Sequence, residues 1–198
     1  MIYIGKVRPS IMEPPVEQSI IQFFSEYNPI EVVVPDDPEK QKELKTIRLD
    51  GFIVGEMKAL IRKNENLISR DCLILDLDDV VISESELVEK ISKKFKKFDY
   101  VLYPTVTHGF KGVRYRLVIP LDKPVKEQEY KLLVSFFSEK VLSDIIRMPD
   151  LSNLTWSQIQ LLPVTTQHVT REQIIISKGE KLFPVEEALL GAKRWEKE

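Results

Sequence analysis

Two aspartates at the end of an apolar segment are the residues of this sequence whose types and spacing best suit chemistry. The segment Cys72–Val80 reads CLILDLDDV, an apolar run that leads directly into acid. Side chains alternate between the two faces of a strand, so Asp76 and Asp78 are predicted to share one face. Like charges on one face repel each other, and this pair therefore predicts a divalent cation bound through oxygen ligands. The alternative is a strand end whose aspartates are merely solvated.

A third acid later in the chain could complete such a metal site. The segment RMPDLSNLTWSQIQLLPV places Asp150 in a polar turn. Asp144 competes with Asp150 for the role of third ligand. The structural alternative for either acid is a helix cap or a turn residue, because a short acidic side chain accepts hydrogen bonds from nearby backbone N–H groups.

A predicted hairpin carries a pair of arginines. A strand over Tyr100–Val106 is followed by a glycine-bounded turn and the strand VRYRLVIPL. Alternation puts Arg114 and Arg116 on one face of that strand. Two permanently charged, fork-shaped donors side by side are suited to phosphate, and His108 and Thr107, at the end of the first strand, could join them. The alternative is two surface arginines on an exposed sheet face.

Further charges lie near the acidic segment in sequence. Arg62, Lys63 and Arg70 precede it, and are either solvated or help to hold a polyanion. We include Arg62 among the candidate nucleotide-binding residues. A helix beginning after Ser83, with Glu86 completing a capping box, carries lysines along one face, a pattern typical of a solvated helix.

Composition limits the class of protein. The chain has 198 residues, 43% hydrophobic and 30% charged, as in ordinary globular proteins. No apolar run approaches the roughly 20 residues that span a bilayer, and no secretory signal is apparent at the N-terminus. With one cysteine, Cys72, an intrachain disulfide is impossible. These features predict a cytoplasmic protein that does not bind a membrane, and the net charge of −2 argues against a strongly basic coat for nucleic acid.

The length and the mixture of expected helices and strands predict one domain over residues 1–185. Residues 1–50 are expected to form its N-terminal part, 51–177 its core, and 186–198 a charged tail or linker. Helices are expected within Val16–Tyr27 and over Glu127–Ile146, where apolar residues recur at helical spacing. A last strand is expected over Ile174–Ile176.

The motifs together resemble those of the archaeo-eukaryotic primase superfamily, especially the primase-polymerase domains of phages, plasmids and other mobile elements. The similar segments are ILDLD at Ile74–Asp78, TVTH at Thr105–His108, the segment around Asp150, and RYRLVIPLDKPV at Arg114–Val125. The resemblance covers about residues 51 to 164.

This resemblance implies an α+β fold, in which an RRM-like antiparallel catalytic sheet with packed helices, within residues 51–177, lies beside an α/β N-terminal part. It also implies Mg²⁺ or Mn²⁺ in a two-metal site. It implies that Asp76, Asp78 and Asp150 bind metal and that His108 contacts the phosphates of the incoming nucleotide. The expected activity is template-directed nucleotidyl transfer by a DNA primase or polymerase. Its expected partners are single-stranded DNA and nucleoside triphosphates, with a helicase or another replication protein as a further partner. We expect Asp76→Ala together with Asp78→Ala to abolish synthesis and to leave the fold intact.

Two other interpretations start from the same residues. A replication-initiator or interaction module could keep a primase-like domain without turnover. LILDLDDVV also resembles the haloacid-dehalogenase phosphatases, in which Asp76 would be the nucleophile and Asp78 the acid/base. The chain lacks the later GDxxxD of those enzymes. Relaxase-type proteins need a histidine pair, and only one usable histidine, His108, occurs here.

Overall fold

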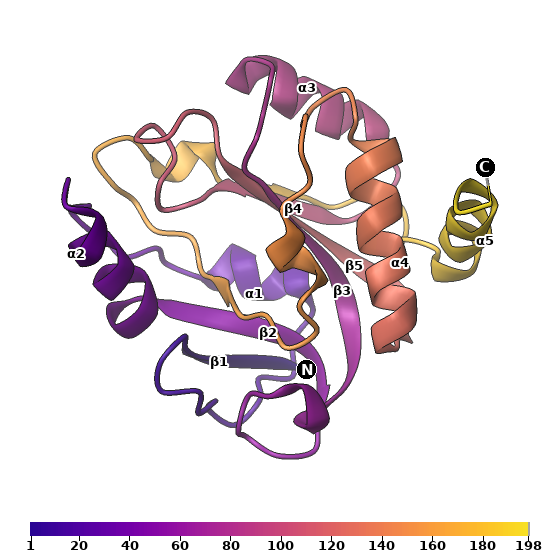
Figure 1. Cartoon of the computed structure of the whole chain (residues 1–198), viewed down its shortest axis with the longest axis horizontal. Helices are drawn as coiled ribbons and strands as arrows, with labels where there is room; N and C mark the ends of the chain where they lie inside the picture. The colour runs from indigo at the N-terminus through magenta and orange to yellow at the C-terminus, as the bar shows by residue number, and fades with distance from the viewer. Residues whose placement is uncertain (198) are drawn as a thin grey trace.

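The computed structural model describes residues 1–197, and its centre is a single antiparallel sheet (Figure 1). The strand order is β1-β2-β3-β5-β4-β7, with β6 paired to β2. The strands are β1 (Ile2–Lys6), β2 (Asp50–Met57), β3 (Leu67–Leu77), β4 (Tyr100–Pro104), β5 (Tyr115–Val125), β6 (Gln160–Leu161) and β7 (Ile175–Ser177). The predicted α+β class is confirmed, and the N-terminal part contributes β1 to the same sheet.

The helices lie on both faces of this sheet. They are α1 (Ile20–Glu26), α2 (Pro38–Glu43), α3 (Glu84–Lys94), α4 (Glu127–Phe136) and α5 (Val185–Trp195). Short π-helices follow α2 as η1 (Leu44–Arg48) and α4 as η3 (Phe137–Val141), and 3₁₀ turns occur at η2 (Asn64–Asn66), η4 (Leu151–Leu154) and η5 (Arg171–Gln173). The capping box predicted for Ser83 and Glu86 is present at the start of α3.

Alternation along β3 divides the core into two layers. Leu73, Leu75 and Leu77 pack with α3, α4 and α5 on one face of the sheet. Cys72 and Ile74 pack with α1 on the other face. Since successive side chains point to opposite faces, Asp76 follows Ile74 onto the α1 face. The short helix α1 covers only part of that face, and the acidic end of β3 lies beyond its apolar cluster.

The predicted hairpin is formed by β4 and β5. Val101 pairs with Val118 and Tyr103 with Arg116 in antiparallel register. The loop that joins the strands turns at Gly109 and Gly112, whose φ angles of 83° and 81° lie in the left-handed region that glycine adopts at little cost. The hairpin therefore brings the residues of the TVTH segment next to the beginning of β5.

A third, smaller apolar cluster holds the N-terminal segment against the hairpin loop. Val34 and Leu49 flank α2 and η1, and they pack with Val106 of the loop and Val164 after β6. Each of these four side chains is at most 7% exposed. Burial of apolar surface thus fixes the segment of α2 and η1 beside the loop that follows β4.

Two predicted helical features differ from the structure. The residues expected as a charged tail form α5, because Ala188 and Ala192 are buried in the main core. Trp195 also packs against Phe136 of α4, with ring centroids 5.8 Å apart. The single long helix expected over Glu127–Ile146 is divided into α4 and η3. The last strand, β7, lies at a sheet edge as expected, paired with β4.

Within residues 1–197, the helices are all too short or too polar to cross a bilayer.

Candidate active site

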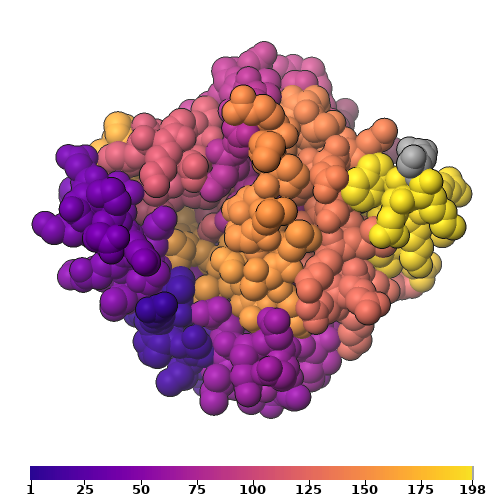
Figure 2. Space-filling model, viewed as in Figure 1, coloured from indigo at the N-terminus to yellow at the C-terminus, as the bar shows by residue number. Residues whose placement is uncertain are grey.

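The acidic end of β3 opens into a small polar cavity. Its volume is about 110 Å³. In Figure 2 it lies in the recess bordered by the purple segment near residue 45, the pink loop between β4 and β5, and the orange segment after Asp150. The residues that line it are Lys45, Asp76, Asp78, Tyr103, Thr105, Val106, Thr107, Arg114, Arg116, Leu161 and Leu162. A larger open groove, of about 640 Å³, lies between α4 and α5 and contains none of the predicted site residues.

Asp76 and Arg116 form the inner ion pair of this cavity. They are direct cross-strand partners on β3 and β5. Arg116 donates from Nε to Asp76 Oδ1 at 2.5 Å and from Nη2 to Oδ2 at 3.0 Å, a two-pronged contact. Its Nη1 also donates to the carbonyl oxygen of Leu161 at 2.6 Å. Although burial alone would lower the pKa of Arg116, Asp76 raises it, so this arginine is charged at every accessible pH.

Asp78 and Arg114 form the outer ion pair, which is more exposed. Arg114 Nη1 donates to Asp78 Oδ2 at 2.7 Å, and its Nε donates to the carbonyl oxygen of Lys111 at 3.3 Å. The side chains of Arg114 and Asp78 are 24% and 33% exposed, against 8% and 12% for Arg116 and Asp76. The sequence predicted that the two aspartates share a face of one strand and that the two arginines share a face of another, and the structure confirms that all four side chains face the same cavity. It also shows that the positive charge between the aspartates is supplied by the arginines.

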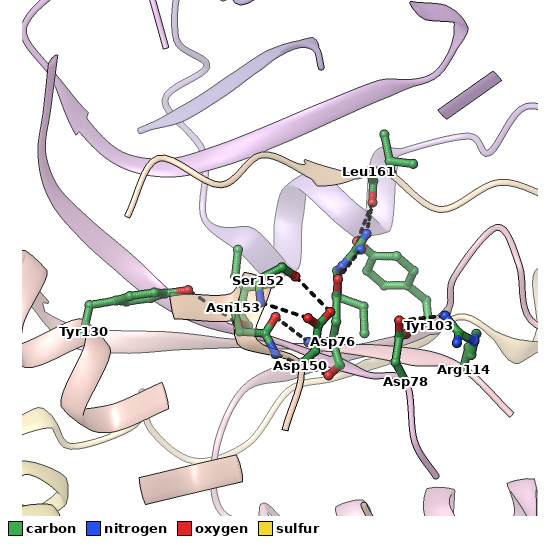
Figure 3. A network of polar contacts seen from close by, with 11 residues as sticks. Asp76, Asp78, Tyr103, Arg114, Tyr130, Asp150, Ser152, Asn153 and Leu161 are labelled. Carbon is green, nitrogen blue, oxygen red and sulfur yellow. Dashed lines mark hydrogen bonds and ion pairs between the residues drawn. The ribbon is translucent and has the colours of Figure 1, made fainter. Parts of the chain in front are cut away.

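The turn that carries Asp150 is held directly against β3 (Figure 3). The side chain of Asn153, which is 1% exposed, accepts from the backbone N–H of Asp76 at 3.0 Å and donates to its carbonyl oxygen at 3.3 Å. Asp150 caps η4 by accepting from the N–H and hydroxyl of Ser152 at 2.9 and 2.8 Å. The structure thus places Asp150 beside the two aspartates of β3, as predicted.

Two other predicted candidates lie elsewhere. Asp144 forms ion pairs with Lys90 and Lys94 of α3, at 2.8 and 3.0 Å. Arg62 donates to the carbonyl oxygens of Val7 and Ser157, at 2.8 and 3.2 Å, and does not line the cavity. The structure therefore places Asp150, and not Asp144, near the aspartates at the end of β3. The contacts of Arg62 connect two backbone segments.

His108 lies behind the cavity wall, and Thr107 is part of that wall. The His108 ring is 6% exposed, and its Nδ1 accepts from the backbone N–H of Arg114 at 3.1 Å. Its Nε2 faces Glu84 Oε2 at 3.7 Å. Tyr115 and Gln173 both donate to Glu84 Oε1. In this arrangement His108 fixes the backbone of Arg114, whereas the sequence resemblance implies a contact with phosphate.

Glu84 is the acid of this buried network. Partial burial by itself would raise the pKa of Glu84. The hydrogen bonds from Tyr115 and Gln173, together with the nearby His108, outweigh burial and hold that pKa below its usual range. Glu84 therefore stays ionised beneath the outer ion pair.

Arg70 was expected to be solvated or to bind a polyanion, and this expectation is wrong. It is fully buried, and it donates to the carbonyl oxygen of Trp156 from Nε at 3.0 Å and from Nη2 at 2.5 Å. Its Nη2 also donates to the carbonyl oxygen of Gln158 at 2.9 Å, and its guanidinium lies 4.9 Å from the ring centroid of Tyr130. This arginine anchors the segment that carries Asp150 and Asn153.

Sequence reasoning missed Lys45 and Asn153. Lys45 lies 31 residues before Asp76, in a polar stretch that gives no local signal of a site. Asn153 follows Asp150 in a turn whose composition indicates only a loop. Lys45 reaches the cavity, and Asn153 reaches the backbone of Asp76, through contacts between distant segments that no local pattern reveals.

The carboxylates fit a divalent cation by their chemistry. Burial raises the pKa of Asp78, and Asp76 and Asp150 raise it further against the opposing effect of Arg114. A set of carboxylate oxygens that repel one another is the environment that such an ion stabilises. In the arrangement described for residues 1–197, no three acids, histidines or cysteines are grouped closely enough to share an ion. In this structure the guanidinium groups of Arg114 and Arg116 supply the positive charge next to Asp78 and Asp76.

The fold and site define an α+β domain in which two aspartates at the end of β3 and two arginines at the start of β5 face one cavity. Residues 35–196 match the VapE N-terminal domain, and the chain belongs to this family. No curated protein matches the chain in sequence. Among solved structures, the AEP domain of the primase-polymerase (PrimPol) of cyanophage S-2L is similar, with 14% identity and a TM-score of 0.48, over 72% of this chain and 69% of that one.

Proposed function

We propose that this domain is a primase-polymerase, a nucleotidyltransferase that joins nucleoside triphosphates on a single-stranded DNA template and releases pyrophosphate. One observation carries the proposal: Asp76, Asp78, Arg114 and Arg116 face a single polar cavity, with Asp150 held beside them. Carboxylates next to fixed cationic donors are what phosphoryl transfer requires, because the reaction depends on positioning and on stabilisation of negative charge.

The side chains divide this work by their burial. Arg114 is the more exposed arginine and binds the phosphates of the nucleotide together with Thr107, which also lines the cavity. Arg116 holds Asp76 in place and contributes positive charge at the base of the cavity. His108 acts as a positioning residue through the backbone of Arg114.

Asp76, Asp78 and Asp150 would hold Mg²⁺ or Mn²⁺. When bound, the ions would supply Lewis-acid stabilisation of the phosphates and would favour ionisation of the attacking hydroxyl. The residues of the chain then have to keep the carboxylates ionised and orient the phosphate chain. The inner and outer arginines already serve the first purpose in this structure.

The test is synthesis on single-stranded DNA with labelled nucleoside triphosphates and Mg²⁺ or Mn²⁺, with and without a primer. Asp78→Asn removes one carboxylate with little change in shape, and should abolish product. Asp144→Asn is the matched control, because Asp144 pairs with α3 away from the cavity, and it should retain activity. Equal synthesis by the two variants would contradict the proposal.

A second candidate is a primase-like initiator or interaction module that binds nucleotide without turnover. Both oxygens of Asp76 accept from Arg116, an arrangement that neutralises the carboxylate within the protein. The synthesis assay separates the two functions: nucleotide binding without product, with and without primer, favours the module. The phosphatase interpretation needs Asp76 to attack phosphorus, and the same contact with Arg116 argues against it.

A further inference from the structure

Lys45, a cationic side chain in the cavity wall, forms no ion pair with an acid within the described residues 1–197. Lys45 belongs to η1, in the N-terminal segment, and lines the same cavity as Asp78 and Arg114. It is about half-buried. No hydrogen bond or ion pair joins its Nζ to any other group in the described part of the chain, residues 1–197. A half-buried ammonium without a partner loses hydration without compensation, and an anionic ligand would restore that loss.

The backbone on both sides of Lys45 is fixed. The N–H of Arg8 donates to the carbonyl oxygen of Thr46 at 2.8 Å, and Lys6 Nζ donates to that of Arg48 at 2.8 Å. Leu49, which is 1% exposed, anchors the end of the segment in the third apolar cluster. Lys45 is therefore held at the cavity by the fold, and its position does not depend on a surface loop that is free to move.

The charges around Lys45 are also positive. Burial lowers the pKa of Lys45, and the nearby Lys111 and Arg114 lower it further, whereas Asp78 opposes the shift. Lys111 lies on the exposed loop between β4 and β5, and its carbonyl oxygen accepts from Arg114. Three cationic groups from two distant segments thus converge on the outer side of the cavity, and only Arg114 of the three is paired with an acid.

The size of the cavity limits what can occupy it. A volume of about 110 Å³ is well below the 300–1,000 Å³ typical of pockets that enclose a small ligand. It can accept phosphate groups, and leaves the sugar and base outside. Lys45 and Arg114 line this cavity, and Lys111 lies near both of them on the exposed loop.

We propose that Lys45 is a phosphate-binding residue that, with Arg114 and with Lys111 at the rim, forms a subsite for a polyphosphate chain. This inference rests on the proposed function, since the chain would be the triphosphate of the incoming nucleotide. Because Lys45 and Arg114 come from different segments, phosphate bound between them connects η1 to the hairpin. Binding should therefore further stabilise the packing of α2 and η1 against the hairpin loop.

The test is calorimetric binding of inorganic tripolyphosphate and of a nucleoside triphosphate, in metal-free buffer, by the whole chain. Lys45→Gln should weaken tripolyphosphate binding by about tenfold or more, because it removes a charge-assisted hydrogen bond to the anion. Lys45→Arg should restore most of the affinity. Lys42→Gln is the matched control, an exposed lysine of the adjacent helix α2 outside the cavity, and it should bind like the wild type.

Hydrogen exchange supplies a second measurement that needs no variant. Tripolyphosphate should slow amide exchange over residues 38–49 and 105–114 of the wild-type protein, and unchanged exchange over both would overturn the inference. Wild-type affinity in Lys45→Gln would also overturn it, and would leave the proposed function intact if the nucleotide still binds and is polymerised. Phosphate binding that depends on Lys45, without any synthesis, would keep the subsite and contradict the polymerase. A wild-type protein that binds no phosphate chain would overturn both.

Discussion

The two Asp–Arg pairs of the cavity have the same chemistry and differ in their surroundings. The inner pair, Asp76 and Arg116, has a two-pronged contact, a further bond to Leu161, and side chains at most 12% exposed. The outer pair, Asp78 and Arg114, has one contact at 2.7 Å and is 24–33% exposed. Separating a buried pair leaves an uncompensated charge, whereas water solvates the partners of an exposed pair. The inner pair therefore contributes more to stability, and the outer pair is the one that a ligand can separate more easily.

This difference changes one expectation from the sequence. Removing both Asp76 and Asp78 was expected to leave the fold intact. Because Arg116 is 6% exposed and both oxygens of Asp76 bind it, Asp76→Ala would leave a buried guanidinium without its anion. Loss of activity in that variant could result from unfolding or from loss of a site residue. Asp78→Asn is therefore the cleaner test of the site.

The largest expected effect is on the inner pair. Arg116→Met should lower the free energy of unfolding by about 3–5 kcal/mol, because Asp76 would remain buried without its partner. Urea denaturation followed by circular dichroism would measure it. The double variant Asp76→Leu with Arg116→Met is the control and should recover much of the loss, since it removes both charges together. A loss below about 1 kcal/mol in the single variant would contradict the structural role of this pair.

A smaller loss of stability is expected from changes where the turn that carries Asp150 contacts β3. Asn153→Ala removes both hydrogen bonds to the backbone of Asp76 and should cost about 1–3 kcal/mol. Hydrogen exchange should also speed up over residues 150–158. Ser152→Ala is the control, because its hydroxyl bonds within the turn to Asp150. If both variants have the same stability and exchange, Asn153 does not hold the turn.

The outer pair should affect binding more than stability. Arg114→Gln should change the free energy of unfolding by less than about 1 kcal/mol, because the pair is partly solvated. It should also weaken nucleoside triphosphate binding about tenfold. Arg147→Gln is the control, since Arg147 forms an exposed pair with the neighbouring Asp79 outside the cavity. A loss of stability as large as that of Arg116→Met would remove the distinction between the pairs.

The smallest effect concerns the network beneath the outer pair. The pKa of Glu84 is lower in the folded protein than in the unfolded chain, so its contribution is present above the unfolded value of about 4.3 and is lost as the pH falls through the folded value. Unfolding free energies of wild type and Glu84→Gln, measured between pH 7 and pH 3, should therefore converge toward acid. A constant difference over that range would show that the ionised form of Glu84 contributes nothing.

Much of the site could be predicted from the sequence because strand alternation is a local property. The spacing of Asp76 and Asp78, and of Arg114 and Arg116, places each pair on one face in any strand. The turn glycines and the two flanking apolar runs likewise predicted the hairpin. The limits of the helices were less predictable. The segment of α5 was expected to be a tail because it contains many charged residues, and the small residues Ala188 and Ala192 give only a weak signal of a buried helix face.

The sequence by itself determined which side chains share a face of each strand, because this follows from side-chain periodicity along short segments, and its motifs resembled those of a family with an antiparallel α+β fold. The tertiary structure decided which arginine neutralises which aspartate, through the register of β3 and β5. It also placed Asp150 near the end of β3 and Asp144 against α3, turned His108 toward Glu84, and brought Lys45 to the cavity. These outcomes depend on how segments far apart in the chain pack together, and no local pattern of residues encodes that packing.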